Sequence, residues 1–150
     1  MQTVRDVKGV RYLLVKRSAE SSRVRDPATG EERYLPNDEL RFEGNDAAPL
    51  AVAAAGVPEA VRRVVTAAHD EQSLGLLIEL ADRGPLSVVE LLDAYALCES
   101  DLHGRLTEFR AARLIEETTV HGERGYDATD ATRSAVASLR SGSENDSIGE

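Results

Sequence analysis

Residues 84–130 read GPLSVVELLDAYALCESDLHGRLTEFRAARLIEETTVHGERGYDATD, and this stretch decides the fold. Ser87 and Glu90 form a capping box, in which the hydroxyl and the carboxylate each satisfy a free backbone N–H at the start of a helix. A turn through residues 96–97 leads to a second helix, which we expect to begin at Cys98 or Ser100. This second helix should place its apolar side chains inward at helical spacing, namely Leu102, Leu106 and Phe109.

A β-hairpin is predicted after this second helix, which should end near Arg113. Residues 116–120 are rich in β-forming residues and polar at alternate positions. Residues 121–125 contain two glycines and predict a turn, and Tyr126 begins the return strand.

Further helices are expected on both sides of this stretch. Pro58 suits the first turn of a helix over residues 58–69, and Asp70 is a plausible cap for the next one. That helix should bury a stripe of apolar side chains: Leu74, Leu77, Ile78 and Ala81. A last helix is predicted from Thr129 or Asp130 to Leu139. Residues 141–150 are small or polar and predict a disordered tail.

The N-terminal part predicts a small β-sheet. Strands are expected over residues 10–17, 22–25 and 32–35, and the second and third are joined by the turn Asp26-Pro27-Ala28-Thr29-Gly30. Pro27 fixes φ early in this turn, and Gly30 tolerates a positive φ at its end. Three short strands bury too little to be stable alone, so we expect this sheet to pack on another element.

These elements predict an α+β protein in four parts: an N-terminal three-stranded antiparallel β-meander, a linker with a short helix, a helical domain with a hairpin, and the tail. Their ranges are 1–43, 44–57, 58–140 and 141–150. The N-terminal sheet is a candidate site for a ligand, for dimerisation or for a second protein.

The charge pattern is acidic but uneven. The net charge is −9, and every basic residue except Lys8 and Lys16 is arginine. Acid excess with little lysine is typical of proteins from salt-loving archaea, although GC-rich codon usage in a mesophile would also favour arginine. Residues 1–43 are nearly neutral and would tolerate a nucleic-acid contact, whereas the acidic excess lies in residues 44–150.

The chain is expected to be cytoplasmic. Its single cysteine, Cys98, cannot form an internal disulfide and is expected to be a small buried apolar group. The sequence begins without the apolar run of a signal peptide, and no apolar run approaches the length of a transmembrane helix.

The stretch resembles winged helix-turn-helix transcription regulators of the ArsR and MarR kind, particularly small regulators of halophilic archaea. The resemblance rests on Pro85-Leu86-Ser87, Ser100-Asp101-Leu102, Arg105-Leu106, Arg113-Leu114-Ile115, Gly125-Tyr126 and Ala128-Thr129-Asp130. These families usually have glycine where Arg113 stands and often serine where Cys98 stands. The resemblance implies a homodimer that binds double-stranded DNA, with the helix after Cys98 in the major groove. The helix over residues 58–69 and the last helix are candidate dimer elements.

If Leu102, Leu106 and Phe109 face the core, helical geometry identifies the residues on the opposite side of the helix, which are expected to contact DNA. Ser100, His103, Gly104 and Thr107 should face the bases. Arg105, Arg110, Arg113 and Arg124 flank this face and are candidate phosphate contacts.

The same segment permits a second interpretation. Acidic side chains outnumber arginines between Ser100 and Tyr126, whereas DNA-binding faces are usually basic. The alternative is therefore a winged-helix protein–protein interaction adaptor without DNA binding. We expect no enzymatic activity, because the sequence has no glycine-rich phosphate loop and no nucleophile–base arrangement. We also expect no metal and no cofactor, since three scattered histidines and one cysteine give no ligand spacing.

Overall fold

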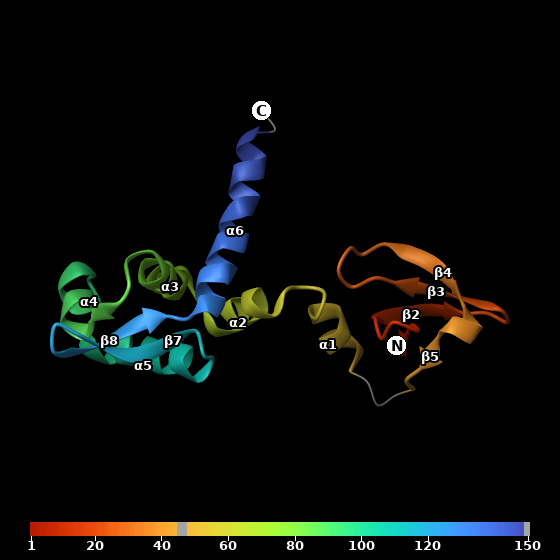
Figure 1. Ribbon diagram of the computed structural model, residues 1–150, viewed down its shortest axis with the longest axis horizontal. Coiled ribbons are helices and arrows are strands. Elements are labelled where there is room, and N and C mark those ends of the chain that lie inside the picture. The colour runs from red at the N-terminus through yellow and green to blue at the C-terminus, as the bar shows by residue number, and fades with distance from the viewer. Residues whose placement is uncertain (45–47, 149–150) are drawn as a thin grey trace. The chain divides into compact units, whose positions relative to one another are not determined.

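The computed structural model describes residues 1–44 and 48–148, and the side chains up to residue 142 (Figure 1). The chain divides into two compact units, Met1–Glu59 and Ala60–Glu150. The fold is α+β, with six α-helices and two antiparallel sheets of five and three strands among the described residues. The expected α+β class is therefore confirmed.

The N-terminal unit contains a five-stranded sheet in the order β4-β3-β2-β1-β5. Its strands are β1 (Thr3–Arg5), β2 (Arg11–Arg17), β3 (Ser21–Arg25), β4 (Glu32–Pro36) and β5 (Arg41–Phe42). The predicted three-stranded meander corresponds to β2, β3 and β4, but the prediction of three strands is wrong. β1 and β5 are too short to show a periodic pattern and are recognisable only through their pairing with each other and with β2.

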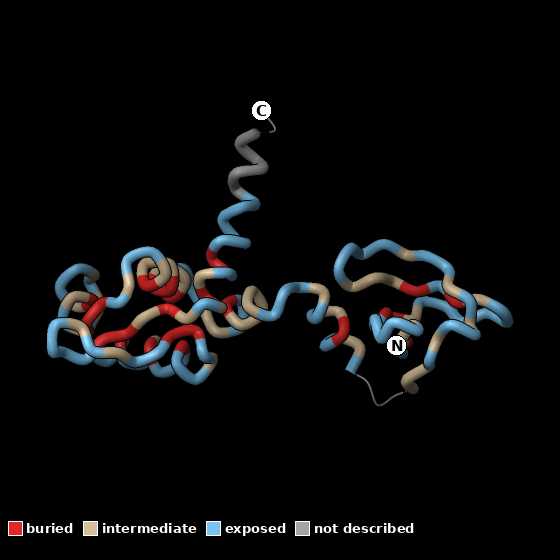
Figure 2. The backbone as a smooth tube through the Cα atoms, viewed as in Figure 1, coloured by how far each residue is buried: buried red, intermediate tan, exposed pale blue. Residues whose placement is uncertain are grey.

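The turn between β3 and β4 has the chemistry expected of it. The Asp26 carboxylate accepts a hydrogen bond of 2.9 Å from the Ala28 N–H, and the Gly30 N–H donates to the Asp26 carbonyl at 2.7 Å. Gly30 has a φ of 76°, which is the left-handed region that favours glycine. The apolar centre of this sheet is small: Val4, Tyr12 and Val24 are buried, and Leu14, Leu35, Leu40 and Phe42 pack against them. Figure 2 shows that the buried stretches of this unit are short.

Helix α1 (Pro49–Ala54) completes the N-terminal unit. The chain that follows it passes very close to the β3–β4 turn. A Cβ atom at Gly56 would lie 2.1 Å from the Pro27 carbonyl oxygen, so a side chain has no room there.

The C-terminal unit combines helices with a three-stranded sheet in the order β6-β8-β7. In chain order it contains α2 (Glu59–Ala67), α3 (Glu71–Arg83), β6 (Leu86–Ser87), α4 (Val88–Ala94), α5 (Glu99–Ala111), β7 (Ile115–Val120), β8 (Glu123–Ala128) and α6 (Asp130–Ile148). β6 was not predicted: it lies directly before the helix that was expected to begin at Ser87, and it pairs with β8.

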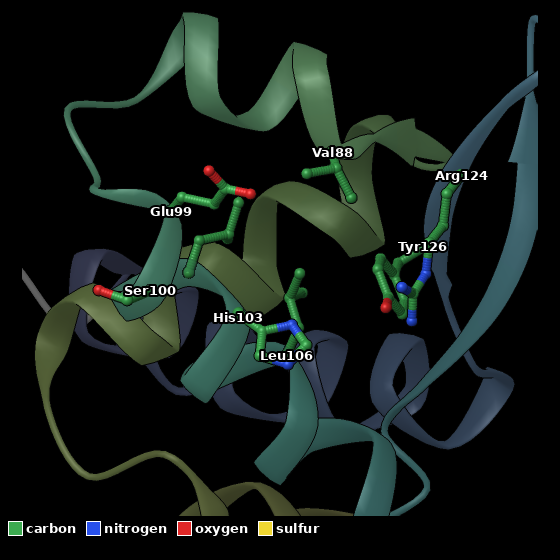
Figure 3. A pocket seen from close by; sticks show the side chains of 8 residues that line it. Val88, Glu99, Ser100, His103, Leu106, Arg124 and Tyr126 are labelled. Atoms are coloured by element: carbon green, nitrogen blue, oxygen red, sulfur yellow. The ribbon is translucent and has the colours of Figure 1, made fainter.

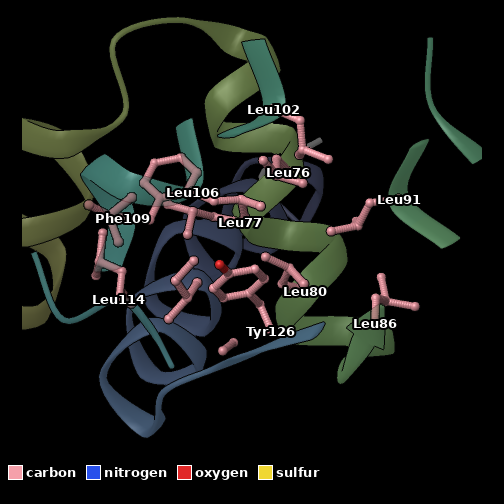
Figure 4. Close-up of a cluster of buried hydrophobic side chains, with 14 residues drawn as sticks. Leu76, Leu77, Leu80, Leu86, Leu91, Leu102, Leu106, Phe109, Leu114 and Tyr126 are labelled. Carbon is pink, nitrogen blue, oxygen red and sulfur yellow. The ribbon is translucent and has the colours of Figure 1, made fainter. Parts of the chain in front are cut away.

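One continuous apolar core joins these elements (Figure 4). The expected inward residues of α5 are buried, with exposures of 3% or less. On α3 the predicted stripe is only partly confirmed: Leu77 is buried, and Leu74 and Ala81 are partly buried against the core. The other fully buried residues of this helix are Ser73, Leu76 and Leu80, which the prediction did not include. The helix turns Ser73 inward because this side chain meets Arg105 of α5. On α2, Val64 is buried while Val65 is 63% exposed.

The hairpin turn is tighter than expected. β7 and β8 pair directly up to Val120 and Glu123, so the turn consists of His121 and Gly122 and does not extend to Gly125. Gly125 is buried inside β8, and a Cβ atom there would lie 2.6 Å from the Leu86 carbonyl oxygen. This glycine therefore allows β6 to approach β8.

The helix ends combine predicted and unexpected features. The capping box of Ser87 and Glu90 is present at α4, and Asp70 caps α3. Cys98 caps α5 and is exposed, so the prediction of a buried cysteine is wrong. α6 continues beyond the expected end at Leu139 to Ile148. Part of the expected disordered tail, residues 149–150, lies outside the described residues.

Candidate nucleic-acid interface

The outer face of α5 presents the residues expected to meet bases. Ser100, His103, Gly104 and Thr107 are all exposed, because the buried stripe fixes the opposite side of the helix in the core. A Cβ atom at Gly104 would meet nothing within 4 Å, so a partner can approach the helix backbone closely there. The Thr107 hydroxyl donates to the His103 carbonyl at 2.8 Å, which leaves its lone pairs to accept a hydrogen bond.

A broad hollow of about 890 Å³ separates α5 from strand β8 (Figure 3). Ser100 and His103 border it from α5, Val88 from α4, and Arg124 and Tyr126 from β8. The structure thus brings two of the predicted base-facing residues next to one predicted phosphate contact. Glu99 also lines the hollow and adds a negative charge at the start of α5.

Arg110 and Arg124 share a single carboxylate. Glu117 on β7 lies 3.1 Å from a terminal nitrogen of Arg110 and 3.0 Å from Nε of Arg124. All three side chains are well exposed, so solvent screens both ion pairs. One carboxylate between two guanidinium groups leaves a local surplus of one positive charge.

Arg105 is directed away from the outer face of α5. Its guanidinium donates to Asp70 at 2.7 Å, to Asp101 at 3.2 Å and to the Ser73 hydroxyl, and its side chain is only 15% exposed. The hydrogen bond from Arg105 lowers the pKa of the Asp70 carboxyl to about 2, and the Ser73 N–H contributes to this shift. Arg105 therefore fastens α5 to the N-terminus of α3.

Arg113 occupies a strained backbone position at the exit of α5. Its φ is 60°, in the left-handed region that favours glycine. The Leu114 N–H reaches back to the Phe109 carbonyl at 2.9 Å, which closes the helix end. The Arg113 side chain is exposed and makes no ion pair among the described residues. Non-glycine residues at such positions are often retained for function.

Cys98 lies at the other end of α5. Its Sγ accepts a hydrogen bond of 3.4 Å from the Asp101 N–H and lies 3.4 Å from the Ser100 hydroxyl. Both hydrogen bonds lower the pKa of the Cys98 thiol, and the one with Ser100 has the larger effect. Cysteine thus performs the capping role for which serine is more usual.

A family model matches residues 1–140 of the chain and is described as a family of unknown function, DUF7346. The chain belongs to the DUF7346 family. No curated protein and no solved structure matches it. The DUF7346 match spans the N-terminal sheet, α5 and the hairpin, so the family includes both units.

Two further observations concern the described part of this DUF7346 chain. Among the described residues, no group of three or more His, Cys, Asp or Glu side chains is placed to bind a metal ion. Nor is any described helix both long and apolar enough to cross a membrane.

Sequence reasoning missed Glu117 as the central residue of this surface. The alternation over residues 116–120 predicts that some of these side chains face solvent. It does not predict which arginines they meet, because Arg110 and Arg124 reach Glu117 from a helix and from the neighbouring strand.

Proposed function

We propose that the C-terminal unit is a winged helix-turn-helix module that binds double-stranded DNA and regulates transcription. The observation that carries this proposal is the element order α3-β6-α4-α5-β7-β8 with the sheet order β6-β8-β7. This order corresponds to the winged-helix arrangement that the sequence resembles. In that arrangement α5 is the recognition helix and the β7–β8 hairpin is the wing.

The exposed residues of α5 support specific roles. Ser100, His103 and Thr107 carry groups that exchange hydrogen bonds with base edges, and Gly104 allows the helix to enter the major groove. Arg110, Arg113 and Arg124 are the proposed phosphate contacts. Arg105 is paired with Asp70 and Asp101 and holds α5 in position. We therefore do not propose it as a phosphate contact.

Glu117 gives this surface a particular electrostatic property. A DNA phosphate must compete with Glu117 for Arg110 and Arg124, so non-specific attraction is weak. Affinity then depends on contacts to bases and on correct placement of the wing. This property suits a regulator that works in concentrated salt, as the acidic, lysine-poor composition indicates for a halophilic archaeon.

We also propose that the functional form is a homodimer that reads two half-sites about one helical turn apart. α2 and α6 are the proposed dimer elements. Light scattering at a series of protein concentrations tests this proposal, and a monomer at all concentrations would contradict it.

The DNA-binding proposal is tested by selecting duplexes from a random pool with the full chain in molar KCl. The expected result is an enriched sequence motif. Arg124→Gln should weaken binding to all duplexes, whereas His103→Ala should alter the selected sequence. The matched control is Arg83→Gln, which removes the same charge from an exposed residue at the end of α3. Failure to enrich any sequence with folded protein contradicts the proposal.

The second candidate function is a winged-helix protein–protein interaction adaptor. It is favoured by the carboxylates beside α5, since Glu99 lines the hollow and Glu117 neutralises part of the wing. Chromatin occupancy in the native salt background separates the two functions. Enrichment at promoters supports the regulator, and uniform background supports the adaptor.

A further inference from the structure

The five-stranded sheet gathers basic side chains on one of its faces. Strand register sets Arg41, Arg5 and Arg11 in one row across β5, β1 and β2. A β-bulge in β2 brings Lys16 opposite Arg23, and Arg25 lies two residues further along β3. We call this the basic face, and its cations are Arg5, Arg11, Lys16, Arg23, Arg25 and Arg41.

The charges on the basic face are not balanced within the sheet. The carboxylates that the register places there are Glu43 and Glu32, and each is shared by two arginines. Glu43 lies 3.6 Å from Arg5 and 3.2 Å from Arg11, and Glu32 lies 2.6 Å from Arg23 and 2.9 Å from Arg25. Like charges on directly opposed strand positions destabilise a sheet, so folding alone does not explain this arrangement.

The opposite face uses its arginines for packing. Arg17 lies 3.8 Å from the centre of the Phe42 ring, and Arg33 lies 5.4 Å from that of Tyr12. These cations cover the small apolar core. The basic face also carries two buried residues, Thr3 and Leu13, and α1 contacts strand β2. The side chains of its ion-paired arginines nevertheless remain 41–47% exposed.

An exposed aromatic ring lies beside the basic face. Tyr34 on β4 is directly opposite Arg23, and it is 60% exposed. A tyrosine in this position buries little of its ring in the protein, but it offers a flat surface on which a base can stack. Positive charge that follows a backbone, together with an aromatic platform, is the combination by which proteins bind single-stranded nucleic acid.

We propose that the basic face binds single-stranded nucleic acid, with its arginines and Lys16 on the phosphates and Tyr34 against a base. The site belongs to the N-terminal unit and does not depend on duplex binding by α5. Glu43 and Glu32 compete with nucleic-acid phosphates for the arginines of the basic face. A bound phosphodiester backbone displaces these two carboxylates from their arginines. The basic face is then a second nucleic-acid site within one chain.

Fluorescence anisotropy of the full chain tests the proposal, with a labelled 15-nucleotide single strand and its duplex as separate probes. The triple variant R5Q/R11Q/R41Q should lower single-strand affinity at least tenfold at fixed salt. The slope of log K against log salt should fall by about 2, since each lost phosphate contact on a single strand contributes about 0.7. Tyr34→Ala should lower the affinity roughly tenfold through lost stacking.

Two controls make the result specific. R17Q/R33Q removes charge from the opposite face of the same sheet, and R110Q/R124Q removes it from the proposed DNA-binding surface. Neither should reduce single-strand affinity more than twofold. Circular dichroism checks folding, and if the triple variant is unfolded, Arg41→Gln alone replaces it with an expected threefold loss.

The proposal is overturned if the triple variant binds the single strand as tightly as the unmodified chain. It is also overturned if R17Q/R33Q weakens binding equally, or if the chain binds only the duplex. A chain that binds the single strand through the basic face and no duplex at all would retain this proposal and contradict the DNA-binding role of α5.

Discussion

The Arg105 guanidinium on α5 donates a hydrogen bond of 2.7 Å to Oδ1 of Asp70, the residue that caps α3. The same oxygen accepts from the Ser73 N–H at 2.8 Å. One carboxylate oxygen therefore both begins α3 and fastens α5 to it. The orientation of the exposed face of α5 depends on this contact.

Replacing Asp70 should loosen both helices. Asp70→Ala removes the cap of α3 and leaves Arg105 without its closest carboxylate, so we expect Tm to fall by roughly 4–8 °C. Thermal unfolding followed by circular dichroism measures this change. Asp93→Ala, at an exposed position on α4, is the control and should shift Tm by less than about 2 °C. Equal shifts in the two variants would contradict the role of Asp70.

The Asp70 carboxyl should also contribute to acid unfolding. Its pKa is lowered to about 2 in the folded chain by Arg105. A depressed folded pKa stabilises the protein above the ordinary carboxyl pKa near 3.9, and this stabilisation is lost as pH falls through about 2. Urea midpoints between pH 5 and pH 2 should therefore fall more steeply for the unmodified chain than for Asp70→Asn. Parallel curves would show that the ion pair does not contribute.

Glycine at position 113 should stabilise the chain. Arg113 has a φ of 60°, and relieving the left-handed strain of a non-glycine residue should add about 1 kcal/mol to the free energy of unfolding. Arg113→Gly should at the same time weaken duplex binding, because it removes a proposed phosphate contact. Arg113→Ala serves as the control for charge loss without relief of strain. A glycine variant no more stable than the alanine variant would contradict this reasoning.

Neutralising Glu117 should strengthen duplex binding. Glu117→Gln frees Arg110 and Arg124 from their shared carboxylate, so we expect duplex affinity to rise about fivefold at moderate salt. The neighbouring Glu116→Gln removes the same charge from an exposed residue that makes no ion pair in the described part of the chain, and it should have a smaller effect. Equal gains from both variants would indicate a general charge effect, and no gain would argue against DNA contact by these arginines.

Two glycines of the C-terminal unit should respond to alanine in opposite directions. Gly125→Ala places a Cβ atom 2.6 Å from the Leu86 carbonyl oxygen and should destabilise the chain by about 2 kcal/mol by forcing β6 away from β8. Gly104→Ala enters open space in the middle of α5 and should stabilise it by about 0.5–1 kcal/mol. Urea unfolding measures both changes. Destabilisation by Gly104→Ala would show that the helix is packed more closely there than the structure indicates.

Local chemistry explains which predictions are confirmed. The capping box at Ser87, the cap at Asp70 and the turn ending at Gly30 each depend on residues a few positions apart, so the sequence alone contains them. The inward stripe of α5 is likewise a matter of helical spacing, and Leu102, Leu106 and Phe109 are buried as expected. At the start of α5, Cys98 takes the capping role that serine more often fills.

Contacts between distant segments explain the corrections. β1 and β5 are strands because they pair with each other, and Gly125 belongs to β8 because β6 lies against it. Helical spacing places Arg105 beside the exposed face of α5. Its hydrogen bonds to Asp70 and Ser73, at the start of α3, turn its side chain away from that face. None of these partners is near in sequence.

By itself, the sequence determined the order of the helices and the hairpin in the C-terminal unit and the exposed face of α5, because capping and helical spacing act over one or two turns. The tertiary structure alone decided which arginines remain available. Asp70 occupies Arg105, Glu117 is shared by Arg110 and Arg124, and strand register collects the basic residues of the N-terminal sheet on one face. Charge pairing depends on distances across the fold, and only the folded chain sets those distances.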